Sequence, residues 1–435
     1  MNKFMSMMER YLLPAANKLN NNLYLAVLRD SFMLAFPLVI FGSIFVVIAN
    51  LPYLDVILGD KAVETLRLVL DAAPNATMAI MTLFVVFGIG YNLSKHYKVE
   101  AIYGSVVAIS SFLLLTPFNI KLDESGQVIG GVIPIDRLGA KGMFVGIIAG
   151  FLSTEIYRRI VQKKWTIRMP AGVPDAVSKS FSSLIPAVLT LSVFLAIRAV
   201  FLFTPWDNVH DFIYTNLQKP LLALGKGLPA TLIAIFFVQL FWFFGLHGQI
   251  IVNSVFDPIW GALALENFEA FTAGAEKLPH IVNKYFIDTF TVGMGGSGMT
   301  LPVIVAIFFV AKSRQLKDLA KLAAPAGIFN VNEPIIFGLP IVLNPLILIP
   351  WIVAPLVVTA FTYFTMAIGL VPPPTGVAVP WTVPVFFNGI LATNSLTGGI
   401  LQIVNFVIVM IIWLPFLIII DRQYYEKEKE QGGLK

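Results

Sequence analysis

The chain has 435 residues, of which 57% are hydrophobic and only 13% are charged, with no cysteine and a formal net charge of +5. A soluble domain carries about 25% charged residues, so this composition excludes an ordinary water-soluble enzyme, a disordered chain and a nucleic-acid-binding chain. Because cysteine is absent, it also excludes a disulfide scaffold, a cysteine-ligated metal site and a nucleophilic or phosphorylated cysteine. Four histidines leave little room for a metal centre, so we expect neither a metal nor a cofactor.

Long runs without Asp, Glu, Lys or Arg predict an all-α polytopic membrane protein. A helix that crosses the hydrocarbon core of a bilayer needs roughly 20 apolar residues. About ten transmembrane helices are expected, at residues 31–54, 72–94, 101–120, 142–160, 180–203, 227–245, 249–265, 289–311, 341–370 and 398–420.

The last third of the chain is apolar but interrupted. Residues 322–420 contain a single charged side chain, Glu333, and two clusters of Pro and Gly. Irregular backbone at membrane depth is tolerated only where it is buried in protein or lines a wet cavity. We therefore expect two re-entrant hairpins, at about 322–340 and 372–395.

Basic residues predict the orientation of the chain in the membrane. With the N-terminus inside, the inner segments carry 20 Lys and Arg residues and the outer segments carry 9. Lys and Arg concentrate in cytoplasmic loops, so both termini are expected in the cytoplasm. The first residues lack the compact apolar core and the cleavage site of a signal peptide.

Glu333 is the first candidate for a functional residue, because an ionisable side chain at membrane depth is costly unless it is solvated or paired. It lies in the segment Asn330-Val331-Asn332-Glu333-Pro334, where a proline-broken helix frees backbone groups to face a ligand. Amide side chains both donate and accept hydrogen bonds, which suits a polyhydroxyl solute. The alternative is a structural carboxylate that caps the hairpin or pairs with a buried cation.

His247 is the second candidate, in a turn flanked by Gly245 and Gly248, with Asn253 a turn and a half later. Imidazole exchanges a proton near neutral pH, so general acid–base catalysis and proton coupling are both compatible with it. The alternative is a histidine at the water interface of a helix end. The other three histidines, His96, His210 and His280, fall in predicted loops and are expected on the surface.

Two further segments contribute candidates. The glycine-rich stretch at residues 293–298 lacks the preceding strand and the lysine of a phosphate-binding loop, so it predicts a helix break or a small-residue packing face. Trp381, in the second expected hairpin, offers a large apolar ring that can stack on a pyranose. The alternative is a tryptophan of the membrane-interface belt. Asn388 is a further polar candidate in that hairpin.

The chain resembles a known family at these residues. The segment Asn332-Glu333-Pro334-Ile-Ile-Phe-Gly-Leu-Pro-Ile-Val-Leu-Asn344-Pro345 resembles the signature of the lactose/cellobiose (diacetylchitobiose) class of phosphotransferase-system permeases, the enzyme IIC component. The turn at His247, the glycine-rich loop and the Pro-Trp381-Thr hairpin match the same family in the same order. The resemblance covers the whole chain.

This resemblance implies a permease that binds a disaccharide such as cellobiose or diacetylchitobiose in the plasma membrane of a bacterium. A separate cytoplasmic enzyme IIB would supply the phosphoryl group from its phosphocysteine, which agrees with the absence of cysteine here. The resemblance also implies a homodimer embedded in the lipid bilayer, with no nucleic acid as a partner. Residues 1–215 would form the dimerisation scaffold, and residues 216–435 would carry the sugar site.

Site roles follow residue by residue. Glu333, Asn332 and His247 are implied by the family as sugar-binding, whereas Asn253, Trp381 and Asn388 are placed by position and chemistry. We expect Glu333 and His247 to act in catalysis by holding the C6 hydroxyl of the sugar, and one of them to accept its proton. The residues leave open which of the two is the base.

Two other functional classes remain open at this stage. A proton-coupled secondary transporter for a small polar solute, with Glu333 and His247 as a proton relay, has similar hairpins and a similar intramembrane acid. A membrane-embedded enzyme or a channel needs a nucleophile dyad or a charged filter, and neither is visible in the sequence.

Overall fold

A computed structural model describes Pro14, Lys18 and residues 21–49, 58–121, 128–170, 172–339, 341 and 344–430. The side chains of Val47, Glu333 and Pro345 lie outside the described part. The chain divides into two compact units, which meet in sequence between Ala223 and Leu224. We call them the N-terminal unit, from Asn21 to Ala223, and the C-terminal unit, from Leu224 onward.

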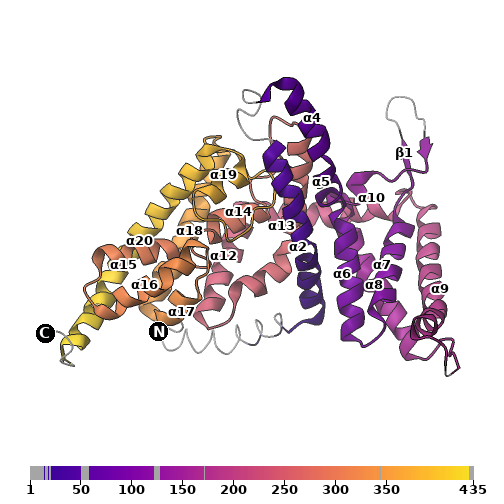
Figure 1. Cartoon of the computed structure of the whole chain (residues 1–435), viewed down its shortest axis with the longest axis horizontal. Helices are drawn as coiled ribbons and strands as arrows, with labels where there is room; N and C mark the ends of the chain where they lie inside the picture. Colours follow the sequence, from indigo (N-terminus) through magenta and orange to yellow (C-terminus); the bar gives the residue numbers. More distant parts are fainter. Residues whose placement is uncertain are drawn as a thin grey trace. The chain divides into compact units, whose positions relative to one another are not determined.

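The N-terminal unit is a helical bundle with one small antiparallel hairpin. Figure 1 shows its helices α6, α7 and α8 side by side, and these three also pack on one another in pairs. The elements are α2 (Leu23–Ala49), α4 (Asp60–Leu70), α5 (Ala72–Asn75), η1 (Met78–Ile80), α6 (Met81–His96), α7 (Ala101–Leu115), β1 (Asn119–Lys121), β2 (Val128–Gly130), η2 (Ile135–Arg137), η3 (Ala140–Gly142), α8 (Met143–Gln162), α9 (Asp175–Phe201), α10 (Val209–Ile213), η4 (Tyr214–Gln218) and α11 (Lys219–Gly225), which crosses the boundary.

Small residues set the close packing of this bundle. A Cβ atom added at Gly88 of α6 would lie 2.8 Å from the Cα atom of Ser31 in α2. On the opposite side of the same helix, a Cβ atom at Gly90 would lie 2.7 Å from the Cα atom of Ser105 in α7. Small residues let helix backbones approach closely, which is how helices associate when lipid removes the hydrophobic driving force.

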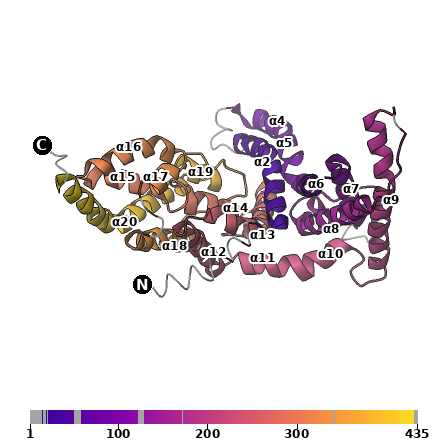
Figure 2. The ribbon, with the colours of Figure 1, turned by 90° about the horizontal axis from the view of Figure 1, so that it is seen from below.

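The C-terminal unit combines long helices with short and broken ones. Figure 2 shows α15, α16 and α17 close together, and α20 packs against α15, α18 and α19. Its elements are α12 (Leu228–Phe243), α13 (Gly248–Thr272), α14 (Lys284–Ile287), η5 (Asp288–Val292), α15 (Thr300–Val310), α16 (Arg314–Ile328), α17 (Glu333–Gly338), α18 (Pro345–Ala367), α19 (Phe387–Thr393) and α20 (Leu396–Glu430).

The helical membrane-protein fold expected from the sequence is confirmed. Five segments of the described chain are long and apolar enough to cross a bilayer, and they are Leu23–Val46, Asp60–His96, Asp175–Phe201, Leu346–Ala367 and Leu396–Glu430. A sixth candidate is the pair Val209–Gly225 and Leu228–Phe243, which is bent by 70°. The shorter apolar helices α7 and α15 lie where two further spans are expected.

The interrupted regions of the C-terminal unit coincide with its prolines and glycines. Helix α16 ends at Ile328, and Asn330 turns the chain in the left-handed region with φ 64° before α17 begins. The expected second hairpin is irregular up to α19, and the amide of Thr375 donates to the carbonyl of Ala392 over 2.8 Å, which ties its two ends together. Irregular backbone is therefore buried against helices, as membrane depth requires.

Candidate functional site

The glycine-rich loop is a sharp break between the π-helix η5 and helix α15. Three of its glycines have positive φ, at 93° for Gly295, 76° for Gly296 and 79° for Gly298, which favours glycine. A Cβ atom at Gly296 would lie 2.7 Å from Cγ of Asn332, and one at Gly298 would lie 2.1 Å from the ring of Trp351. Glycine is therefore required here because the loop backbone lies directly against two side chains.

Asn332 joins this loop to the start of α17. Its side-chain amide donates a hydrogen bond to the carbonyl of Ser297 over 2.9 Å, and the residue is only 6% exposed. Helix α17 begins at the next residue, Glu333, which is followed by Pro334 in the first turn, where a missing N–H costs nothing. The glycine-rich loop therefore fixes the backbone at the start of α17, which begins with Glu333. The side chain of Glu333 is outside the described residues.

His247 caps the N-terminus of α13. Its Nδ1 accepts a hydrogen bond from the amide of Ile250 over 3.3 Å, and its ring centre lies 4.4 Å from that of Trp242. Because Nδ1 accepts, the neutral ring carries its proton on Nε2, which is a hydrogen-bond donor in this tautomer. The side chain is exposed, at the helix end where the sequence places it.

A chain of amide hydrogen bonds connects the start of α13 to the glycine-rich loop. The hydroxyl of Ser297 donates to Oε1 of Gln249 over 3.1 Å, and Nε2 of Gln249 donates to Oδ1 of Asn253 over 3.3 Å. Ser297 thus links Asn253 with Asn332, so the structure brings these two candidates together. His247 lies at the N-terminus of the same helix as Asn253 and is not part of this hydrogen-bond chain. Gln249 and Ser297 were not predicted. Gln249 lies one helical turn before Asn253, and that spacing is the signal that could have identified it.

Asn330 connects the same loop to the segment that carries Trp381. Its Oδ1 accepts from the amide of Gly295 over 2.7 Å, while its Nδ2 donates to the carbonyls of Trp381 and Val383 over 2.6 and 3.0 Å. The side chain of Trp381 is 48% exposed, so its ring is accessible while its backbone is held. The sequence analysis quoted Asn330 without giving it a role, and the structure makes it the central connection.

Asn388 lies in a buried network next to this segment. It is 1% exposed, and its Oδ1 accepts from the hydroxyl of Thr289 over 2.7 Å. Gln402 of α20 completes the network, because its Nε2 donates to the carbonyl of Thr289 and its Oε1 accepts from the amides of Phe386 and Gly389. Sequence reasoning missed Gln402, since one glutamine in a long apolar helix gives no spacing signal.

Three charged side chains gather farther along α13. Lys284 of α14 lies 3.0 Å from a carboxylate oxygen of Asp257 and 3.5 Å from one of Asp288, at side-chain exposures of 29%, 17% and 22%. Burial alone would lower the pKa of Lys284, but the two carboxylates outweigh it and raise that pKa. The amine therefore stays protonated and holds α13 to the segment that precedes the glycine-rich loop.

Two histidines that were expected on the surface are packed inside instead. His210 in α10 is fully buried, and its Nε2 lies 3.0 Å from the hydroxyl of Thr116. The ring of His280 is 12% exposed, and its Nε2 lies 2.5 Å from Oε2 of Glu266. The surface prediction was wrong for both because it considered loop position alone and not the hydrogen-bond partners that tertiary packing supplies.

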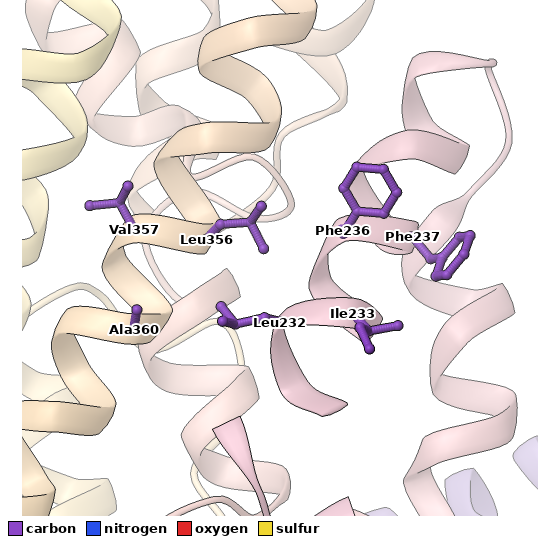
Figure 3. A pocket seen from close by; sticks show the side chains of 7 residues that line it. All are labelled: Leu232, Ile233, Phe236, Phe237, Leu356, Val357 and Ala360. Atoms are coloured by element: carbon purple, nitrogen blue, oxygen red, sulfur yellow. The ribbon is translucent and has the colours of Figure 1, made fainter. Parts of the chain in front are cut away.

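A groove between α12 and α18 is unsuited to a polar solute. It has a volume of about 510 Å³ and is lined by Leu232, Ile233, Phe236, Phe237, Leu356, Val357 and Ala360. Figure 3 shows these seven side chains, none of which carries a hydrogen-bonding group. A sugar hydroxyl placed here would lose its hydrogen bonds to water without replacement, so the amide-rich cluster around Ser297 remains the candidate site.

Comparison with known proteins supports one family. The family model described as "Phosphotransferase system, EIIC" matches residues 29–355. The chain is 60% identical to the oligo-beta-mannoside-specific EIIC component of Bacillus subtilis (strain 168), over 97% of this chain and 95% of that protein. It is 40% identical to the cellobiose-specific EIIC component of Geobacillus stearothermophilus, over 99% and 97% of the two chains.

A solved structure resembles the chain along almost its whole length. The crystal structure of the transporter ChbC, the IIC component from the N,N'-diacetylchitobiose-specific phosphotransferase system, superposes with a TM-score of 0.92. The two are 41% identical, and the match covers 97% of this chain and 99% of ChbC.

Proposed function

This chain belongs to the EIIC family of the phosphotransferase system, and from that premise we propose that it takes up a β-linked disaccharide through the amide-rich site around Ser297. EIIC permeases are multi-pass proteins of the bacterial plasma membrane and act with a sugar substrate and a separate IIB component. The chain is therefore a sugar permease of this system. The observation that carries the proposed site is the hydrogen-bond chain that joins Asn253 to Asn332 through Gln249 and Ser297. His247 caps the helix that carries Asn253.

The substrate class rests on the relatives and on the chemistry of the site. Their names specify an oligo-β-mannoside, cellobiose and N,N'-diacetylchitobiose, and all three sugars are β-linked. Amide and hydroxyl side chains suit such uncharged sugars because each sugar hydroxyl both donates and accepts. The exposed ring of Trp381 would cover one apolar face of a pyranose.

We assign two kinds of role to the site residues. His247, Asn253, Trp381 and Glu333 contact the sugar in this proposal, since the first three are at least partly exposed. Asn332 and Asn388 are buried and bond to protein groups, so they act by fixing the loops around the sugar.

The proposed chemistry is transfer of a phosphoryl group to the C6 hydroxyl of the sugar. The hydroxyl oxygen attacks the phosphorus of the IIB phosphocysteine, the P–S bond breaks, and the thiolate leaves with the electron pair. In this proposal Glu333 accepts the hydroxyl proton, because Nδ1 of His247 already accepts from the amide of Ile250 and its Nε2 is a donor in that tautomer. The two residues together orient the hydroxyl oxygen. Such transfers depend mainly on positioning and on charge stabilisation.

Assembly and orientation are part of the same proposal. We place both termini in the cytoplasm, on the distribution of Lys and Arg. Residues 1–215 form the dimer contact of a homodimer, and residues 216–435 carry the sugar. Displacement of the sugar-binding half against this scaffold would expose the site alternately to each side of the membrane.

Uptake of labelled cellobiose and mannobiose into vesicles that contain the protein tests this function. With phosphoenolpyruvate, the general phosphotransferase proteins and IIB supplied inside, we expect sugar phosphate to accumulate and a proton uncoupler to have no effect. The opposite result is accumulation of unmodified sugar that the uncoupler abolishes and that does not depend on IIB. That result would contradict the proposal and support a proton-coupled transporter.

A further inference from the structure

Arg198 lies near the end of α9, where two cavities of the N-terminal unit adjoin. One is a charged cavity of about 630 Å³, and the other is a groove of about 820 Å³ along α7 and α9. Arg198 lines both of them. The two cavities together therefore offer a polar compartment and an apolar compartment that meet at one guanidinium group.

The groove has the surface chemistry of a binding site for a hydrocarbon chain. Its apolar lining includes Leu113 and Phe118 on the α7 side and Val188, Leu191 and Leu195 on α9. Phe118, Val188 and Leu195 are 42%, 54% and 56% exposed, so the groove is open along its length. Lipid tails are as apolar as these side chains, so the groove gives an acyl chain a surface to pack against and adds no hydrophobic driving force.

The charged cavity is lined by three carboxylates, of Asp136, Asp207 and Asp211, and by three cations, of Arg137, Lys141 and Arg198. Asp207 has an interaction partner, and the other two carboxylates form ion pairs. Arg137 lies 2.6 Å from a carboxylate oxygen of Asp211, and Lys141 lies 2.6 Å from one of Asp136. These two cations are neutralised by their carboxylate partners, so neither provides surplus positive charge for a ligand.

Arg198 is different because both of its recorded hydrogen bonds go to neutral oxygens. Its Nη1 donates to the carbonyls of Leu114 and Thr116, over 2.7 and 2.9 Å, at the C-terminal end of α7. Within the described residues, no carboxylate forms an ion pair with this guanidinium. A guanidinium has five N–H donors in a rigid fork, so it is held in place by α7 and retains donors for an oxyanion.

We propose that these adjoining cavities bind one phospholipid with an anionic headgroup. Its phosphate bonds to the guanidinium of Arg198, and its headgroup hydroxyls enter the charged cavity, where Asn119 and Asn208 are among the lining residues. One acyl chain lies along the groove between α7 and α9. The occupant is a phospholipid because only an amphiphile matches an apolar groove that ends at an uncompensated cation.

Native mass spectrometry of the full-length protein tests headgroup selection. The probes are phosphatidylglycerol and phosphatidylcholine, added to delipidated protein in equal amounts. We expect wild type to retain phosphatidylglycerol about fivefold better, the preference that one cation near the headgroup supplies. Arg198→Gln should remove this preference, although its amide can still donate to the carbonyls of α7.

Arg67→Gln is the matched control, because Arg67 also donates to a backbone carbonyl, that of Ala49, and lines neither cavity. This variant should keep the preference. Equal retention of both lipids by wild type, or an unchanged preference in Arg198→Gln, would overturn the proposal.

Two variants of the groove test its occupant. Leu191→Trp fills the groove and should lower retention of both lipids, whereas retention equal to wild type would overturn the assignment of the acyl chain.

Because the protein has no cysteine, Ser192→Cys introduces a single thiol. Efficient disulfide dimers of this variant in native membranes would show that a second copy of the chain covers the groove, which also overturns the proposal. An uncrosslinked thiol supports it.

Discussion

Asn330 holds three backbone groups from two segments of the C-terminal unit with one buried side chain. Its amide bonds to Gly295 in the glycine-rich loop and to the carbonyls of Trp381 and Val383. It also has φ 64°, a backbone conformation that asparagine tolerates better than most residues. The backbone conformation and the hydrogen bonds of the side chain therefore both favour asparagine at position 330.

Asn330→Asp should destabilise the protein and weaken sugar binding. Aspartate tolerates the same φ and keeps an acceptor for Gly295, but it places a carboxylate oxygen against two carbonyl oxygens. We expect a loss of about 1–3 kcal/mol in the free energy of unfolding, measured by thermal unfolding in detergent. Asn394→Asp is the control, because Asn394 is exposed at φ 50°. Equal losses in the two variants would contradict the bridging role.

Trp381→Ala should weaken sugar binding without unfolding the site. The ring is 48% exposed, while the backbone is fixed by Asn330, so its removal leaves the loop in place. We expect the Kd for cellobiose or mannobiose to rise roughly fivefold, equivalent to about 1 kcal/mol. Trp165, which is 57% exposed in the N-terminal unit, provides the control variant Trp165→Ala. Unchanged affinity in Trp381→Ala would refute stacking.

Helix α13 carries polar side chains at intervals of one turn. Gln249, Asn253 and Asp257 are spaced by four residues and so share one face of the helix. The first two connect to the glycine-rich loop, and the third pairs with Lys284. This face therefore joins the proposed sugar site at one end to an ion pair at the other.

Lys284→Met should loosen the contact between α13 and α14. It leaves the carboxylates of Asp257 and Asp288 close together without their shared cation. We expect a loss of about 1–3 kcal/mol in the free energy of unfolding, and the double variant Lys284→Met with Asp257→Asn should recover part of it. Thermal unfolding of the two single variants and the double variant checks this. If the loss of stability in the double variant equals the sum of the losses in Lys284→Met and Asp257→Asn, the two residues are not coupled.

Sequence reasoning located the helices well because apolar length and Pro or Gly interruptions are local signals. It located the Asn332–Glu333 element, the turn at His247 and the helix break at residues 293–298 for the same reason. It missed Gln249, Ser297 and Gln402, since their roles depend on partners distant in sequence. The environment of a loop histidine such as His280 is likewise decided by tertiary packing rather than by local pattern.

The two units have different construction. The long helices α2, α6, α7, α8 and α9 dominate the N-terminal unit, and glycine and serine pack several of them closely. The C-terminal unit contains the broken helix α16–α17 and the amide network. This contrast agrees with the proposal that one half is a scaffold and the other binds sugar. Transport in which one half moves against the other requires a rigid support and a binding site built from loops and broken helices.

Topology at the scale of the whole molecule is tested with single cysteines. We expect a membrane-impermeant maleimide to label Lys61→Cys and Lys277→Cys in intact cells, because both residues are exposed and belong to predicted outer segments. Lys317→Cys and Lys163→Cys should be labelled only after the cells are opened. Labelling of the second pair in intact cells would reverse the orientation.

The most direct test of the central claim compares sugar binding with sugar phosphorylation in Glu333→Gln. Gln keeps the size of the side chain and its hydrogen bonding but cannot accept the hydroxyl proton. We predict that disaccharide binding persists while phosphorylation by phospho-IIB falls by about 10²-fold or more. The control Glu276→Gln, at an exposed carboxylate of the same unit, should match wild type. Wild-type phosphorylation by Glu333→Gln would contradict the account.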